Sequence, residues 1–229
     1  MVPPVERVLL NRRRPVCTWA LLGVTGLVFL VEALFGGLSS SYPAIVMGAK
    51  VNQLIDAGQL YRLVTPIFLH FGLAHVACNA YALYIWGPIV ESLFGRAKFL
   101  LVYIGSGMVG VAASYCFSSA FSAGASGAIF GLLGAMLTFR KKRPVSFKRM
   151  IGPQLIVLIG INLVFGFLGQ GVDNCAHLGG LAGGYLLALG AGLYGERTSP
   201  AHRALGLAGA LALWVGLLAL GHTGLTRFF

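Results

Sequence analysis

A serine and a histidine that could act as nucleophile and base lie in two glycine-rich stretches of an otherwise apolar chain. Ser126 lies in GASGAIFG, and His177 lies in NCAHLGGLAGG. A serine hydroxyl becomes nucleophilic when an adjacent base takes its proton, and histidine is the base most often used for this. Serine beside glycine is also an ordinary packing residue of membrane helices. The choice between these interpretations depends on whether the fold brings both side chains together.

A further polar group occurs in the stretch HFGLAHVACNAY, residues 70–81. His75 and Asn79 are four residues apart, so they share one face of a helix. Both side chains can donate hydrogen bonds, which the stabilisation of an oxyanion requires. The alternative is that this pair satisfies polar groups of the preceding loop. His70, one further turn away, is expected to be structural.

The composition places these residues in a membrane. Of 229 residues, 57% are hydrophobic and 10% are charged, whereas a soluble domain carries about 25% charged residues. A membrane-spanning helix needs about 20 apolar residues. The chain has seven segments of this general kind: Val16–Phe35, Leu73–Val90, Phe99–Phe117, Ser126–Phe139, Ile151–Leu168, Cys175–Tyr194 and Arg203–Leu220. We therefore expect an all-α polytopic membrane protein that forms one helical bundle.

The first apolar segment follows RRRP and could be read as a secretory signal peptide. It is long for that purpose, lacks a clear A-x-A cleavage site and precedes many more apolar segments, so we interpret it as a retained transmembrane helix. The four cysteines show no metal-binding spacing. Cys116 and Cys175 could both lie near the outer face, which leaves a disulfide between them open.

The formal charge of +11 could indicate nucleic-acid binding, but the positions of the charges indicate membrane orientation instead. Fourteen of the 17 basic residues fall in the N-terminal tail and in alternate loops, at positions 7, 12–14, 96, 98, 140–143, 148–149, 197 and 203. Lys50, Arg62 and Arg227 fall on the other side. The positive-inside rule therefore predicts a cytoplasmic N-terminus, an outer C-terminus and no nucleic-acid partner.

The length of the fourth segment predicts the depth of Ser126. Ser126 to Phe139 is 14 residues, about 21 Å of helix, against a hydrocarbon core about 30 Å thick. Ser126 should thus lie roughly 10 Å below the outer surface. The preceding FSSAFSAGA must descend as irregular backbone, which is tolerated there only inside protein or beside a water-filled cavity. The chain from Gly36 to His70 should form short helices at the outer interface.

Glycine spacing offers a way for the fourth and sixth segments to meet. Small residues recur at a spacing of four in both: Gly127, Gly131 and Ala135 in one, and Gly180 and Gly184 in the other. Such faces let membrane helices approach closely, and the contact would bring His177 near Ser126. Glycine faces mostly reflect packing, however, and a lone membrane histidine can be a structural hydrogen-bonding residue.

Taken together, these stretches resemble the rhomboid family of intramembrane serine proteases. The matches to the family's motifs, in family order, are His75 and Asn79 for His-x-x-x-Asn, ESLFGRAKFLLVY for the link between helices two and three, Gly124-Ala125-Ser126 for Gly-x-Ser, and Ala176-His177 with Gly180 and Gly184 for Ala-His and its glycines. The resemblance covers roughly residues 16–194.

The resemblance implies a serine endopeptidase with a Ser126–His177 dyad and an oxyanion site formed by His75, Asn79 and the Ser126 backbone. It assigns cavity or packing roles to Gly124, Gly127, Phe130, Gly180 and Gly184. It implies no metal and no cofactor. Substrates would be transmembrane segments of other proteins, cut within the lipid bilayer of a prokaryotic plasma membrane, near its outer face.

The same resemblance implies the domain organisation. Residues 1–15 would be a short basic cytoplasmic tail, and residues 16–194 a six-helix rhomboid-like core. Residues 195–229 would add a linker and a seventh C-terminal transmembrane helix, a variant that the family contains.

Two positions depart from the family's pattern. Tyr61-Arg62 stands where Trp-Arg is common, and Phe130 replaces a tyrosine that often faces the histidine. Phe130 can still stack on the ring of His177. Asp173 could be a third triad member, but a residue directly before a helix is a natural N-cap, and the family works as a dyad.

Two functions of other classes remain open. A small transporter would need polar residues that continue toward the cytoplasmic side, and the fourth and sixth segments have almost none beyond Ser126 and His177. A binder of membrane helices without proteolytic activity would share the fold and is distinguished by a cleavage assay.

Overall fold

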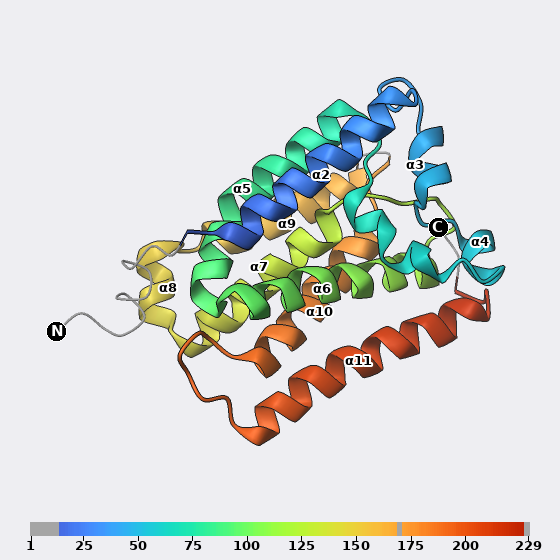
Figure 1. The fold of residues 1–229 in the computed structure, drawn as a ribbon. Helices are drawn as coiled ribbons and strands as arrows, with labels where there is room; N and C mark the ends of the chain where they lie inside the picture. Colours follow the sequence, from blue (N-terminus) through green and yellow to red (C-terminus); the bar gives the residue numbers. More distant parts are fainter. Residues whose placement is uncertain (1–13, 169–170, 227–229) are drawn as a thin grey trace.

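The computed structural model describes residues 14–168 and 171–226, and this part of the chain is mostly helical (Figure 1). Its longer helices are α2 (Val16–Leu34), α5 (Leu73–Phe94), α6 (Arg96–Phe117), α7 (Ser126–Lys142), α9 (Gln154–Leu168), α10 (Asn174–Ala191) and α11 (Pro200–His222). Each of the seven predicted segments overlaps one of these helices, with ends that differ by a few residues. Most of the predicted basic tail, with Arg7, Arg12 and Arg13, lies outside the described residues, as does Arg227.

Four of these helices, α2, α5, α6 and α11, are long and apolar enough to cross a membrane. A fifth crossing could be made by α8 (Pro144–Met150) together with α9, although the pair is bent by 71°. α7, with 17 residues, and the glycine-rich α10 do not meet the same criteria of length and hydropathy. Seven membrane crossings therefore stay a prediction, although each predicted segment overlaps a helix.

α6, α7 and α10 form the centre of the bundle. The most extensive contacts between helices are those of α10 with α7 and with α6, and 72% of the most apolar stretch of α6 is buried, against 28% for α2 and 17% for α11. α2 and α5 pack together on one side of this centre, and α11 lies along α6 and α10 on another (Figure 1). The outer helices thus leave large apolar surfaces for lipid.

The close approach of α7 and α10 is a glycine-to-backbone contact. A methyl group added at Gly180 would lie 2.0 Å from the carbonyl oxygen of Gly127, and one added at Gly184 would lie 2.0 Å from that of Gly131. A real Cβ cannot come that near a backbone atom, so these positions require glycine. The two glycine faces predicted from the sequence do pack against each other.

The chain between α2 and α5 forms the predicted short helices. They are α3 (Tyr42–Met47), α4 (Asn52–Asp56), η1 (Leu60–Leu63) and η2 (Thr65–Phe68). Arg62 ties this loop together, because its guanidinium donates to the carbonyl oxygens of Ile45 at 2.8 Å and Ala49 at 2.7 Å. α3 and α4 lie at the opposite end of the bundle from α8 (Figure 1).

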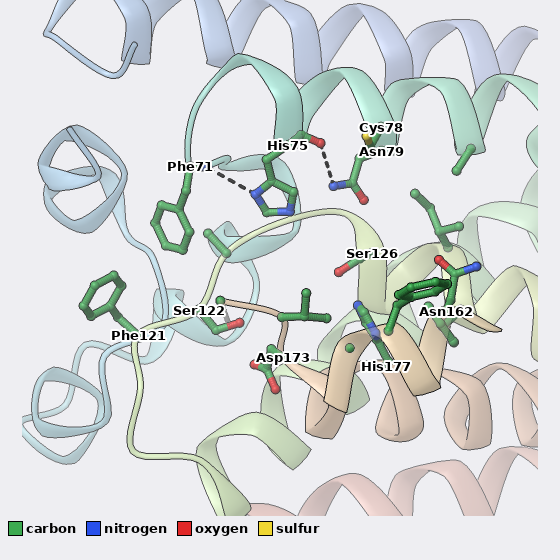
Figure 2. A pocket seen from close by; sticks show the side chains of 18 residues that line it. Phe71, His75, Cys78, Asn79, Phe121, Ser122, Ser126, Asn162, Asp173 and His177 are labelled. Atoms are coloured by element: carbon green, nitrogen blue, oxygen red, sulfur yellow. Dashed lines mark hydrogen bonds between the residues drawn. The ribbon is translucent and has the colours of Figure 1, made fainter. Parts of the chain in front are cut away.

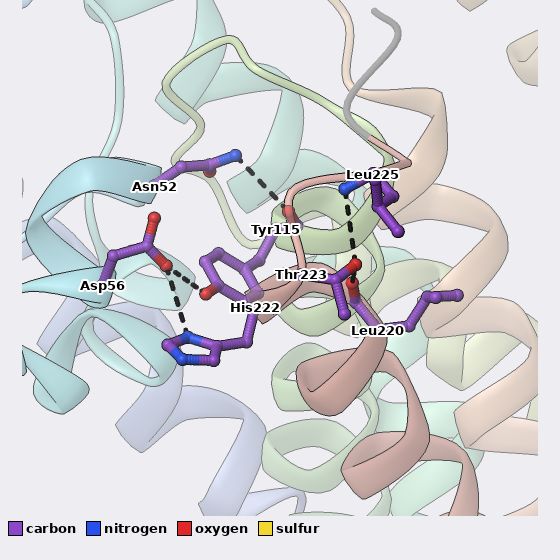
Figure 3. Close-up of polar contacts among 7 residues, drawn as sticks. All are labelled: Asn52, Asp56, Tyr115, Leu220, His222, Thr223 and Leu225. Carbon is purple, nitrogen blue, oxygen red and sulfur yellow. Dashed lines mark hydrogen bonds and ion pairs between the residues drawn. The ribbon is translucent and has the colours of Figure 1, made fainter.

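Polar contacts fasten the far end of α11 to this loop and to α6 (Figure 3). The Tyr115 hydroxyl of α6 donates to Asp56 of α4, and Nδ1 of His222 lies 3.8 Å from the same carboxylate. Beyond α11, the Thr226 hydroxyl donates to the carbonyl oxygen of Cys116 at 2.6 Å. Cys116 and Cys175 are both free thiols, so the disulfide left open by the sequence is not formed.

Candidate active site

Ser126 is the first residue of α7, where an irregular segment enters the bundle. That segment is held by Lys50, whose buried ammonium donates to the carbonyl oxygens of Ser118 and Ala120, both at 2.8 Å. Lys50 and Ser122 also form an isolated backbone bridge. The irregular backbone predicted before Ser126 is present, and Lys50, from the chain between α2 and α5, supplies hydrogen bonds to it. The depth of this segment in a bilayer stays a prediction.

A cavity of about 490 Å³ opens in front of Ser126. Its lining includes His75 and Asn79 from α5, Asn162 from α9 and His177 from α10. Figure 2 shows the Ser126 side chain and the His177 ring pointing toward one another, with His75 and Asn79 on the α5 side of the same cavity. The structure therefore brings together the four polar residues that the sequence analysis proposed for the site. They are Ser126, His177, His75 and Asn79.

The ring of His177 is fixed by stacking. It lies parallel to Phe130, with ring centroids 4.2 Å apart and planes 8° apart, and only 7% of the residue is exposed. Phe130 therefore stacks on His177 as expected, although it lacks the hydroxyl of the tyrosine that is common at this position. Phe130 thus sets the plane in which His177 faces Ser126.

Asp173 serves α10 as a helix cap. Its Oδ1 accepts the backbone N–H of Ala176 at 3.0 Å, as predicted for a residue just before a helix. Within the described residues, Nδ1 of His177 is buried without a hydrogen-bond partner. In a triad that nitrogen would donate to the acid, so Asp173 does not hold the position of a triad acid here.

His75 presents a hydrogen-bond donor to the cavity. The backbone N–H of Phe71 donates to its Nδ1 at 3.3 Å, so a neutral ring carries its proton on Nε2. The side-chain nitrogen of Asn79 donates to the carbonyl oxygen of His75 at 3.0 Å and retains a second N–H. Two donors from one face of α5 therefore border the cavity above Ser126 (Figure 2).

Gly124 lets the chain pass directly under His75. Its φ is +129°, and an added methyl would lie 2.8 Å from both Cε1 and Nε2 of that ring. Conformation and space therefore both require glycine here. The local geometry thus explains why the first residue of the Gly-x-Ser stretch is glycine.

His70 lies behind this arrangement, 1% exposed. Its Nε2 accepts the backbone N–H of Ala125 at 3.4 Å, and its ring meets that of His75 edge-on at 5.1 Å. Burial, followed by the neighbouring His75, lowers the pKa of His70 to about 3. A neutral His70 next to the Ser126 turn agrees with the structural role expected for it.

Three residues of this region were missed in the sequence: Glu32, Lys50 and Asn162. Glu32 and Lys50 are fully buried charged side chains, and ionisable residues in apolar surroundings are a signal of function that could have found them. Asn162 lies in a strongly apolar helix and lines the cavity. A polar side chain within such an apolar helix was the signal that could have identified Asn162.

Fold and site together define a class: a polytopic helical membrane protein whose bundle holds a serine and a histidine in one cavity. A family model of the Rhomboid domain matches residues 57–193, more than half of the chain. The chain therefore belongs to the rhomboid family, as the resemblance of its motifs implied. With its apolar helices, this makes it an integral membrane protein.

Named relatives support this assignment. The chain is 41% identical over 216 residues to Rhomboid protease GluP of Bacillus subtilis (strain 168), covering 94% of this chain and 42% of that protein. It is 41% identical over 145 residues to RHOMBOID-like protein 1 of Arabidopsis thaliana, covering 62% of this chain and 37% of that protein. The chain thus spans less than half the length of either relative.

Proposed function

We propose that this protein is an intramembrane serine endopeptidase that cuts transmembrane segments of other membrane proteins near the outer face of the bilayer. The observation that carries the proposal is the shared cavity of Ser126, His177, His75 and Asn79. The proposal is supported by the relative named Rhomboid protease GluP, whose match covers 94% of this chain. Residues 16–194 would form the catalytic core, oriented with the N-terminus in the cytoplasm of a prokaryotic cell.

The proposed chemistry is a Ser–His dyad. His177 takes the proton of the Ser126 hydroxyl as Oγ attacks the scissile carbonyl carbon. The protonated ring then donates that proton to the leaving amine, which leaves an acyl-enzyme ester on Ser126. Water then attacks the ester carbonyl while His177 takes its proton, and the protonated ring returns that proton to Oγ of Ser126 as the carboxylic acid product leaves. The stack on Phe130 keeps the ring in one orientation through both halves of the cycle.

The proposed oxyanion site consists of Nε2–H of His75, the free N–H of Asn79 and the backbone N–H of Ser126. Donors of this kind stabilise the charge that develops on the carbonyl oxygen, and losing one typically costs about 2.7–4 kcal/mol of transition-state stabilisation. Of the two glycines beside the serine, Gly124 leaves room for the ring of His75, and Gly127 packs against the carbonyl oxygen of Ala176 and against Gly110. Gly180 and Gly184 act indirectly, because they hold α10 and its histidine against α7.

The walls of the cavity suggest the class of substrate. Both α5 and α9 line the cavity, with Ala82 and Phe165 among their lining residues, and both helices carry exposed apolar side chains. A transmembrane helix entering between them must unwind before a peptide bond reaches Ser126. Substrates with glycine, proline or other poor helix formers near their outer end should therefore be cut best.

The decisive experiment compares two serines of the same cavity. Ser126→Ala should reduce cleavage of a test transmembrane substrate to background, because it removes the nucleophile, whereas Ser122→Ala should cleave as wild type does. Ser122 lines the cavity but binds Lys50 through its backbone alone. The assay uses purified full-length chains reconstituted in liposomes.

A serine-directed fluorophosphonate provides a readout without any substrate. It should label wild type and Ser122→Ala and leave Ser126→Ala unlabelled. Cleavage by Ser126→Ala at the wild-type rate would contradict the proposal. So would wild-type protein that is folded but neither cleaves nor is labelled, the result expected of a binder without proteolytic activity.

A further inference from the structure

Glu32 is a fully buried carboxylate on the apolar helix α2, away from the cavity described above. Both of its carboxylate oxygens lie 3.2 Å from the backbone nitrogen of His70. Within the described residues, no Lys, Arg or His side-chain nitrogen lies within 4.0 Å of it. Its partner is thus a single backbone N–H rather than a counter-ion.

His70 connects that contact to both halves of the proposed active site. Its ring accepts the N–H of Ala125, the residue before Ser126, and packs edge-on against His75, a proposed oxyanion donor. Burial leaves the ring of His70 little freedom, since 1% of the residue is exposed. A displacement of its backbone would therefore move the turn that begins α7 and the ring of His75 together.

We propose that Glu32 is a positioning residue for catalysis: it accepts the N–H of His70 and so fixes the relative placement of Ser126 and His75. The inference rests on the proposed function. A buried acceptor within apolar surroundings is costly unless it is paired. Glu32 pairs with His70, whose ring contacts both Ala125, the residue before Ser126, and His75.

The contact predicts that reach and acceptor capacity matter, and that negative charge does not. Glu32→Gln keeps an oxygen acceptor at the same reach. Glu32→Asp keeps the charge but is one methylene shorter, and Glu32→Leu fills the space without an acceptor. The matched control is Thr25→Val. Thr25 lies two turns earlier on α2, is 2% exposed, and has a hydroxyl without a hydrogen-bond partner among the described residues.

The experiment measures kcat and KM for a test transmembrane substrate in liposomes, together with the rate of fluorophosphonate labelling and the unfolding temperature. Glu32→Asp and Glu32→Leu should lose at least tenfold in kcat and in labelling rate, with KM within twofold of wild type. Glu32→Gln should recover to within threefold, and Thr25→Val should match wild type. A role limited to holding the loop folded would lower the unfolding temperature without this order among the variants.

Two results would overturn the inference: Glu32→Asp as active as wild type, or Glu32→Gln as impaired as Glu32→Asp. Because these two variants decide the matter, a Glu32→Leu protein that does not fold leaves the test intact. Failure of the proposed function looks different. In that case wild type itself neither cleaves nor is labelled, whereas failure of the inference alone leaves an active wild type and active Glu32 variants.

Discussion

Gly124 shows how much a single residue contributes to this site. It adopts a backbone conformation that L-residues rarely take, and it does so beneath the ring of His75. The neighbouring Ser126 can then begin a helix while the chain still passes close to the oxyanion side. Gly124 thus sets the distance between the proposed nucleophile, Ser126, and the proposed oxyanion donors on α5.

Gly124→Ala should therefore impair catalysis more than folding. The added methyl would collide with His75 at 2.8 Å and push the ring away from the cavity. We expect kcat to fall by about 100-fold, the effect of losing one oxyanion donor. The measurement is the cleavage rate of a test substrate, with circular dichroism to show that the helices persist.

The control for this variant is Gly58→Ala. Gly58 has a φ of +93° and open space where its methyl would lie, so it carries the backbone strain without the collision. Activity should stay close to wild type in Gly58→Ala. Equal loss in both variants would show that strain alone, and not contact with His75, explains the effect.

At the scale of helices, the pair α7 and α10 determines whether the site exists at all. Ser126 begins one helix and His177 lies in the first turn of the other. Backbone contacts between glycines set their separation. A larger side chain in this seam would act on the serine–histidine distance from a position that touches neither residue.

Gly184→Ala is expected to destabilise the bundle. Its methyl would meet the backbone of Gly131 at 2.0 Å, and overpacking of this kind costs about 1–3 kcal/mol or more. For a chain of this size that is a fall of roughly 2–4 °C in unfolding temperature for each kcal/mol. Thermal unfolding in detergent measures it.

Gly160→Ala in α9 is the matched control, because nothing lies within 4 Å of its added methyl. Alanine has the higher helix propensity, so this variant should be as stable as wild type or slightly more so. A fall in unfolding temperature as large in Gly160→Ala as in Gly184→Ala would argue against glycine-dependent packing of α7 on α10.

Most of this helical architecture could be predicted from the sequence, because hydrophobic segments and glycine spacing are local patterns. The start of α7 at Ser126 and the cap at Asp173 followed from such patterns, and the stack of Phe130 on His177 followed from the family resemblance. The supports of the site did not. Glu32 and Lys50 act through hydrogen bonds to backbone groups far away in the chain, and no local periodicity encodes which distant carbonyl or N–H a buried side chain will reach.

At the scale of the whole molecule, charge separates the two ends of the bundle. The basic run at 140–149 lies at the end of α7 and along α8, opposite α3 and α4 (Figure 1). Lys50 and Arg62, the two described basic residues predicted on the outer side, are buried and bound to carbonyl oxygens. Their positions therefore do not weaken the charge asymmetry that predicts orientation.

Reporter fusions after Phe229 test that orientation in a bacterial host. Alkaline phosphatase, which is active only outside the cytoplasm, should be active at this position, and green fluorescent protein should be dark. The same reporters fused within the basic run after Arg143 should give the opposite pattern. The predicted topology would be inverted if alkaline phosphatase were active after Arg143 and inactive after Phe229.

Cys78 gives the cavity a feature that is useful to chemists. Its thiol is exposed on α5 and lines the space in front of Ser126, one residue before Asn79 (Figure 2). A ligand tethered there could occupy the cavity while leaving the serine hydroxyl chemically intact. A thiol-directed reagent would then block the cavity, and a serine-directed reagent would modify Ser126, so the two effects could be measured separately. Small fragments could also be selected for binding in the cavity before a serine-reactive group is attached to them.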